Sequence, residues 1–177
     1  MAPEPSPERI ALPAFTCVVR GLKAGMHRYV ELLPRIGESP ALGRIARGRA
    51  VRERLVRGAR VRLAPIRGYC WVDVAVPCIV LSTRYYREGS DRDLYLDLLH
   101  ELTHLRQIAE GQDVWDERYE YADRVTEIEG YAVAVGEGRR LGMTEEEILE
   151  HLTNPWMTAA DVGRLRTHVE RWLGRGR

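Results

Sequence analysis

Two histidines and a glutamate stand at the spacing His100-Glu-Leu-Thr-His104, the pattern HExxH. Residues four apart lie on one face of an α-helix, so both imidazoles can reach the same ion. Imidazole nitrogens bind Zn²⁺, and Glu101 lies beside them, where a carboxylate can take a proton from a zinc-bound water. Because so short a pattern also arises by chance, its meaning depends on a surrounding helix and a third ligand.

The residues around the motif predict one long helix over 90–110. Ser90-x-x-Asp93 has the spacing of a capping box, with Asp in place of the usual Glu, and Gly111 marks the other end. The apolar positions between them form a core stripe: Leu94, Leu98, Leu102, Leu105 and Ala109. At 100° per residue the two histidines point away from this stripe, so we expect them to line a cleft. Asp97 could orient one imidazole, or be a plain exposed charge.

A catalytic zinc site keeps three protein ligands and one water, so a third ligand must follow the motif. The metzincin pattern HExxHxxGxxH fails, because Gln107 stands in place of Gly and Glu110 in place of the last His. The third ligand is therefore expected on the next predicted helix, residues 116–141.

Two glutamates of that helix, Glu127 and Glu129, compete for this role, and periodicity separates them. Glu129 lies on a stripe of small and apolar residues, whereas Glu127 lies about 160° away on a face that we expect to be solvated. A carboxylate on a buried stripe is costly unless it is paired or bound to a metal. We therefore predict Glu129 as the third ligand. The alternative is a buried salt bridge from Glu129 to Arg106 or Arg118.

The motif His100-Glu-Leu-Thr-His104, followed by Glu129-Gly-Tyr-Ala132 on a second helix, resembles the gluzincin branch of the zinc peptidases. The small size and the β-rich run before the motif resemble the compact ImmA/IrrE-type metallopeptidases, over roughly residues 60–142. The resemblance implies Zn²⁺ held by His100, His104 and Glu129, with Glu101 as general base in peptide-bond hydrolysis.

One position departs from that resemblance. Val133 stands where the ExxxD arrangement of the family has an Asp that supports a ligand histidine. Asp97, Asp123 or a backbone carbonyl would have to replace it.

The predicted fold is α+β and mostly helical, zincin-like, with a small sheet before the motif helix. Residues 60–86 are rich in β-formers and predict two or three strands, which we expect to be antiparallel. Residues 22–36 and 41–57 have helical spacing. Capping boxes at Thr144 and Thr158 open two C-terminal helices.

One zincin-like domain is expected over 13–177, after a disordered, Pro-rich lead-in at 1–12. Its parts are an Arg-rich helical segment (13–59), the sheet with the metal-site helices (60–142) and the C-terminal helices (143–177).

The composition, 45% hydrophobic and 30% charged in 177 residues, is that of a soluble globular protein. We expect no membrane partner and a cytoplasmic location, because no apolar run is long enough to span a bilayer and no secretory signal opens the chain. The odd set Cys17, Cys70 and Cys78 lacks CxxC spacing, which favours buried free thiols. A Cys70–Cys78 disulfide and a thiolate held against the zinc are the alternatives.

The charge is unevenly distributed along the chain. Residues 1–90 carry 16 basic and 7 acidic side chains, and residues 91–177 carry 11 and 19. Nine arginines fall between Arg44 and Arg67 with a single acid, Glu53. This stretch could bind nucleic acid or an acidic partner, or form a solvated face that also docks on the acidic half.

Three functions follow as hypotheses. The first is a zinc-dependent peptidase acting on a peptide or protein substrate. The second is a regulatory protein that binds nucleic acid or protein and whose metal site is structural or sensory. The third is a protein whose metal only stabilises the fold. The sequence does not choose an oxyanion-stabilising residue among its candidates: His151, His168, Tyr119, Tyr121 and Tyr131.

Overall fold

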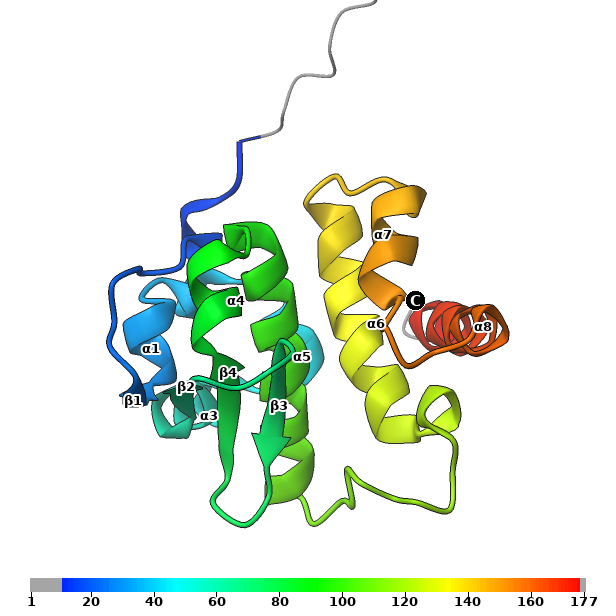
Figure 1. The fold of residues 1–177 in the computed structure, drawn as a ribbon, viewed down its shortest axis with the longest axis horizontal. Helices are drawn as coiled ribbons and strands as arrows, with labels where there is room; N and C mark the ends of the chain where they lie inside the picture. Colours follow the sequence, from blue (N-terminus) through cyan, green and yellow to red (C-terminus); the bar gives the residue numbers. More distant parts are fainter. Residues whose placement is uncertain (1–10, 176–177) are drawn as a thin grey trace, which may run out of the picture.

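The computed structural model describes residues 11–175, which form an α+β fold that is mostly helical (Figure 1). The predicted fold class is confirmed at this level. The lead-in predicted at 1–12 lies, apart from residues 11 and 12, outside the described residues. Within 11–175, none of the helices has both the length and the apolar character that crossing a bilayer requires.

Four short strands form one mixed sheet in the order β1-β2-β4-β3. They are β1 (Gly25–Arg28), β2 (Arg60–Ala64), β3 (Cys70–Asp73) and β4 (Cys78–Ser82). The antiparallel prediction is wrong for one pair, since β2 and β4 run parallel with Val61 opposite Ile79. The cause is the β3–β4 hairpin, whose turn is held by Asp73 Oδ1 accepting from the amide of Ala75. This hairpin inserts β4 beside β2 and leaves β3 at the sheet edge.

The segment before β2 forms shorter helices than its helical spacing predicts. Residues 22–36 contain β1 and a single turn of helix, α1 (Tyr29–Leu32). Residues 41–57 are divided between α2 (Leu42–Ile45) and α3 (Arg49–Gly58). The division lies at Gly48, whose φ of 83° is a left-handed conformation that interrupts an α-helix.

The long helix predicted around the motif is α5 (Asp91–Ala109). Its predicted N-cap is confirmed, because Ser90 Oγ accepts a hydrogen bond from the amide of Asp93 at 3.1 Å. Just before it, residues predicted as the end of a strand form α4 (Thr83–Glu88). Ser82 ends the strand there by capping the helix that follows.

The second metal-site helix, predicted over 116–141, is the shorter α6 (Val125–Arg140). The residues before it form a loop, because Asp113 and Asp116 accept hydrogen bonds from amides two residues on, a turn that competes with helix. A 3-10 turn (Tyr121–Asp123) then leads into α6. The chain ends in α7 (Glu145–Leu152) and α8 (Ala159–Arg175), capped at Thr144 and Thr158 as predicted.

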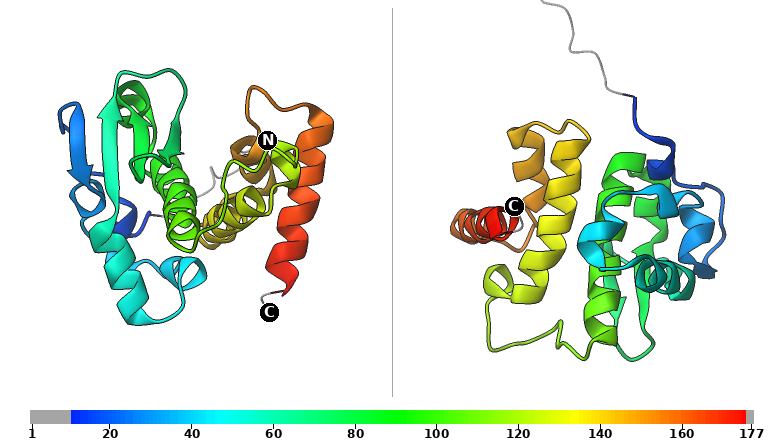
Figure 2. Two further views of the ribbon diagram at one scale, coloured as in Figure 1. Left: turned by 90° about the horizontal axis from the view of Figure 1, so that it is seen from below. Right: turned by 180° about the vertical axis from the view of Figure 1, so that it is seen from behind.

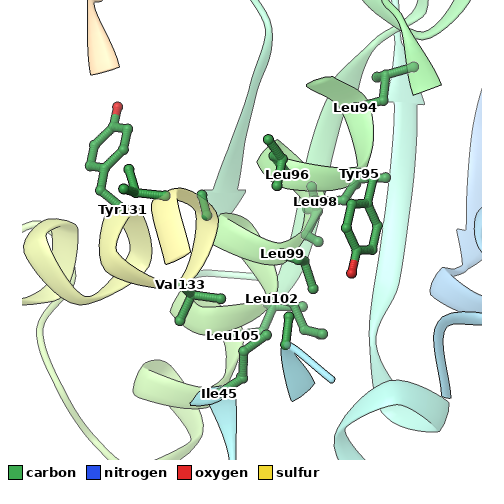
Figure 3. Close-up of a cluster of buried hydrophobic side chains, with 14 of the residues drawn as sticks. Ile45, Leu94, Tyr95, Leu96, Leu98, Leu99, Leu102, Leu105, Tyr131 and Val133 are labelled. Atoms are coloured by element: carbon green, nitrogen blue, oxygen red, sulfur yellow. The ribbon is translucent and has the colours of Figure 1, made fainter. Parts of the chain in front are cut away.

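Helix α5 lies between the sheet and α6, and the views of Figures 1 and 2 agree on this arrangement. Four residues of its predicted stripe, Leu94, Leu98, Leu102 and Leu105, are buried, whereas the fifth, Ala109, is exposed. Leu96 and Leu99 on its other sides are also fully buried (Figure 3). The helix is therefore buried on nearly all sides over its central turns. Its two histidines lie inside the molecule, where a neighbouring element must supply their partners.

Candidate metal centre

Three potential metal ligands converge where α5 meets α6. The Nε2 atoms of His100 and His104 lie 2.9 Å apart, both facing the same point. The carboxylate of Glu127 lies 3.2 Å from Nε2 of His100 and 3.5 Å from Nε2 of His104. All three side chains are buried, at 6%, 4% and 4% exposure. Two imidazole nitrogens and a carboxylate oxygen within 4.8 Å of one another are a donor set suited to a divalent metal.

The electrostatics of this cluster favour a bound cation. Burial by itself raises the pKa of Glu127, but the two imidazoles beside it outweigh burial and hold the pKa below its usual range. Burial likewise opposes a charge on His104, yet the carboxylates of Glu127 and Glu101 raise its pKa to about 9. The cluster thus retains a proton that a metal would displace.

A glycine on α6 lets the two helices come this close. A Cβ at Gly130 would lie 2.9 Å from Nδ1 and Cε1 of His100, closer than real Cβ contacts. The imidazole of His100 therefore packs directly on the backbone of α6. Tyr131 covers another part of the ring edge-on, with ring centroids 4.4 Å apart.

The structure does not bring Glu129, the predicted third ligand, to the histidines. Glu129 forms an ion pair with Arg106 and accepts a hydrogen bond from Nε2 of Gln107 at 2.8 Å. The two glutamates lie on opposite faces of α6, and both faces are covered, so burial does not identify the ligand. The expectation that Glu127 is solvated is wrong, and the alternative salt bridge from Glu129 to Arg106 is present.

The general base predicted from the motif, Glu101, is buried beside the cluster of His100, His104 and Glu127. Burial raises the pKa of its carboxyl group. One carboxylate oxygen lies 3.7 Å from the thiol of Cys70, which donates to it, and the other has no hydrogen-bond partner within residues 11–175. A carboxylate with a raised pKa and a free oxygen is suited to accept a proton from water.

A cleft of about 630 Å³ gives access to the cluster. The strand β3 forms one wall, and the other wall comes from α6, α7 and the residues that follow α7. His100, Glu101 and His104 line it together with Glu127. Because β3 is an edge strand, a free strand edge borders the candidate metal centre.

The support expected for a ligand histidine from Asp97 or Asp123 is not found. Asp97 accepts a hydrogen bond from the hydroxyl of Tyr85 at 2.5 Å, and Asp123 pairs with His168. Nδ1 of His100 has no hydrogen-bond partner within the described residues. Support exists for the other histidine, because the side chain of Gln107 lies 2.7 Å from Nδ1 of His104. The sequence signal was the position three residues after His104, one turn along the same face.

The candidates for oxyanion stabilisation separate into two groups. Tyr121, Tyr131 and His151 line the cleft, and the hydroxyl of Tyr131 lies 2.9 Å from that of Tyr121. His168 and Tyr119 are not among the residues that line it.

The remaining predicted features lie away from the cluster or at its margin. The cysteines are free in the described structure, with Cys78 buried, Cys70 partly buried in the cleft and Cys17 exposed. The expectation of buried thiols is therefore wrong for Cys17. The arginines between Arg44 and Arg67 are spread over α2, α3, β2 and the loop after it, and some are paired locally, as Arg49 is with Glu53.

Comparison of the chain with protein-family models, with curated proteins and with solved structures finds no match.

Proposed function

We propose that this protein is a metal-dependent peptidase in which His100, His104 and Glu127 hold the ion and Glu101 is the general base. The observation that carries the proposal is the convergence of these three ligand atoms in the lining of a cleft, with Glu101 among the same lining residues. The two-nitrogen, one-oxygen donor set suits Zn²⁺ best among the common divalent metals.

When bound, the ion would polarise the scissile carbonyl and lower the pKa of an attacking water. Glu101 accepts the proton of that water as the new carbon–oxygen bond forms. It then passes the proton to the leaving nitrogen as the carbon–nitrogen bond breaks, so that a carboxylic acid and an amine result. Its raised pKa supports both steps, because a carboxylate that holds a proton more firmly is a stronger base.

The free edge of β3 supports an extended peptide as the substrate. Backbone groups of an edge strand can pair with a peptide laid along the cleft, and side chains alternate toward and away from its walls. Tyr131 and His151 line the opposite side of the same cleft. They are placed to donate to a carbonyl oxygen of a peptide held between the two walls.

The test is metal content and proteolysis on the full chain and three variants. Glu127→Ala should lose about one equivalent of bound zinc and all hydrolysis of an unfolded protein such as reduced casein. Glu101→Gln should keep the zinc and lose hydrolysis by about 10²–10⁴-fold, the usual share of a general base. Glu120→Gln changes an exposed carboxylate outside the cleft and should match the parent.

Two results would contradict the proposal. Hydrolysis that survives Glu101→Gln would show that the activity arises elsewhere. Zinc bound by His100, His104 and Glu127 without turnover of any peptide, together with a large fall in melting temperature on chelation, would instead support a metal that stabilises the fold.

A further inference from the structure

The amide of Gln107 is buried between the metal cluster and a carboxylate that the cluster does not use. The side chain is fully buried, and its oxygen lies 2.7 Å from Nδ1 of His104. Its nitrogen donates to the backbone oxygen of Thr126 at 3.1 Å and to Glu129 at 2.8 Å. Both hydrogens of the amide nitrogen therefore have acceptors, and the oxygen accepts from His104.

This arrangement determines which nitrogen carries the hydrogen when His104 is neutral, the form that binds a metal. The two acceptors, Thr126 and Glu129, fix the orientation of the Gln107 amide, because reversing it would set its oxygen against two other oxygens. The amide oxygen must then accept from Nδ1–H of His104. Nε2 is left to face His100 and Glu127 with its lone pair available for a metal.

We propose that Gln107 is a positioning residue that holds His104 as a metal ligand, and that Glu129 in turn holds Gln107. The inference rests on the metal centre proposed above. It also assigns a role to Glu129, which the sequence suggested as a metal ligand. Glu129 orients Gln107, and Gln107 orients the ligand His104. Histidine ligands of metals usually donate their second nitrogen to such a partner, and its loss typically weakens metal binding by about 10–100-fold.

Glu129, the last residue of this series of hydrogen bonds, is itself held by an ion pair. Arg106 forms ion pairs with both Glu129 and Glu110, which compensates the burial of the Glu129 carboxylate. The support is one-sided, because Nδ1 of His100 has no such partner within residues 11–175. His104 is therefore the ligand whose direction the protein fixes by hydrogen bonding, while His100 is held by packing on Gly130.

The test measures zinc affinity by chelator competition on the full chain. Gln107→Met keeps the size of the side chain and removes its hydrogen bonds, and should raise the dissociation constant for zinc about 10–100-fold. Glu129→Gln keeps an oxygen that can accept from Gln107 and should bind zinc nearly as the parent does. Glu110→Gln is the matched control, since it changes the other carboxylate paired with Arg106 and lies outside the hydrogen-bond chain.

A spectroscopic readout separates positioning from a general loss of structure. In the zinc-loaded parent, the Nδ1 proton of His104 should be protected from exchange and visible by ¹H–¹⁵N NMR. In Gln107→Met it should exchange rapidly, with the other histidine signals retained. If Gln107→Met does not fold, Glu129→Met provides the test, with a smaller loss of affinity and faster exchange of the same proton expected.

Unchanged affinity and unchanged exchange in the variant that folds would overturn the inference. Loss of zinc in Glu129→Gln as complete as in Glu127→Ala would also overturn it, because Glu129 would then be a ligand. Zinc binding that weakens as expected in a protein with no peptidase activity would support the positioning role and contradict only the proposed function. A parent chain that takes up no zinc would overturn both.

Discussion

Gly130→Ala is expected to destabilise the protein, although it replaces glycine by the best helix former. The new Cβ would lie 2.9 Å from Nδ1 and Cε1 of His100 and 3.2 Å from its Cγ. Overpacking of this kind costs about 1–3 kcal/mol, while alanine gains about 1 kcal/mol over glycine inside a helix. The net change in the free energy of unfolding is then a loss of about 0–2 kcal/mol.

A second glycine provides the matched control. Gly163 lies inside α8, and a Cβ added there would meet nothing within 4 Å. Gly163→Ala should therefore show only the gain of about 1 kcal/mol, which raises the melting temperature by about 2–4 °C in a chain of this size. The difference between the two variants isolates the contact with His100, about 1–3 kcal/mol.

The assay is chemical denaturation of both variants without metal, followed by zinc affinity. If the imidazole of His100 swings aside to relieve the overlap, the stability loss will be small and the affinity for zinc will fall instead. Both effects depend on α6 packing directly against His100. Stabilisation of Gly130→Ala equal to that of Gly163→Ala, with unchanged zinc affinity, would refute that packing and with it the geometry of the metal centre.

Two further predictions concern pH and metal removal. Since the pKa of His104 in the folded, metal-free protein is raised to about 9, against about 6.5 for an unfolded chain, its contribution to stability is complete below pH 6.5 and lost as the pH rises through 9. The melting temperature of the metal-free protein should therefore fall between about pH 6.5 and 9, and this fall should be smaller in Glu127→Gln. A melting temperature of the parent that does not change over this range would contradict the ion pair between His104 and Glu127. Zinc at about a thousand times its dissociation constant should add about 4 kcal/mol, and removing it with a chelator should lower the melting temperature by about 8–16 °C. Scanning calorimetry with and without chelator checks this, and equal melting temperatures would show that the ion does not bind the folded state.

The motif helix was predictable because its signals are local. Ser90 caps it, the leucine stripe fills its core face, and Gly111 follows its end. The sheet was less predictable, because the strand order depends on which strand of the β3–β4 hairpin pairs with β2. The sequence of strand β1 shows little alternation of apolar and polar residues, and three of its four residues are exposed. Nothing in residues 22–36 distinguishes it from a turn of amphipathic helix.

Periodicity did not predict that Glu127, rather than Glu129, lies beside the two histidines, and the reason is physical. Periodicity separates a buried face from a solvated one, but α6 is covered on both sides, so its two faces differ only in what covers them. A local signal was present: Gly130 lies three residues after Glu127, on the same face of the helix. Close approach of two helices needs a small residue beside the ligand, and that spacing favours the face of Glu127.

Of the three carboxylates of α6, Glu127 is buried, Glu129 is partly buried, and both pair with side chains of α5. Glu129 meets Arg106 and Gln107, so its charge is compensated whether or not a metal is present. Glu127 pairs with the imidazoles of His100 and His104, which can compensate its charge by keeping a proton or by sharing a metal. The proposed metal binding would exchange a proton for a doubly charged ion at Glu127 and leave the contacts of Glu129 unchanged. The proposed centre would therefore lose its metal without leaving a buried charge unpaired, and we expect the fold to persist in the metal-free protein.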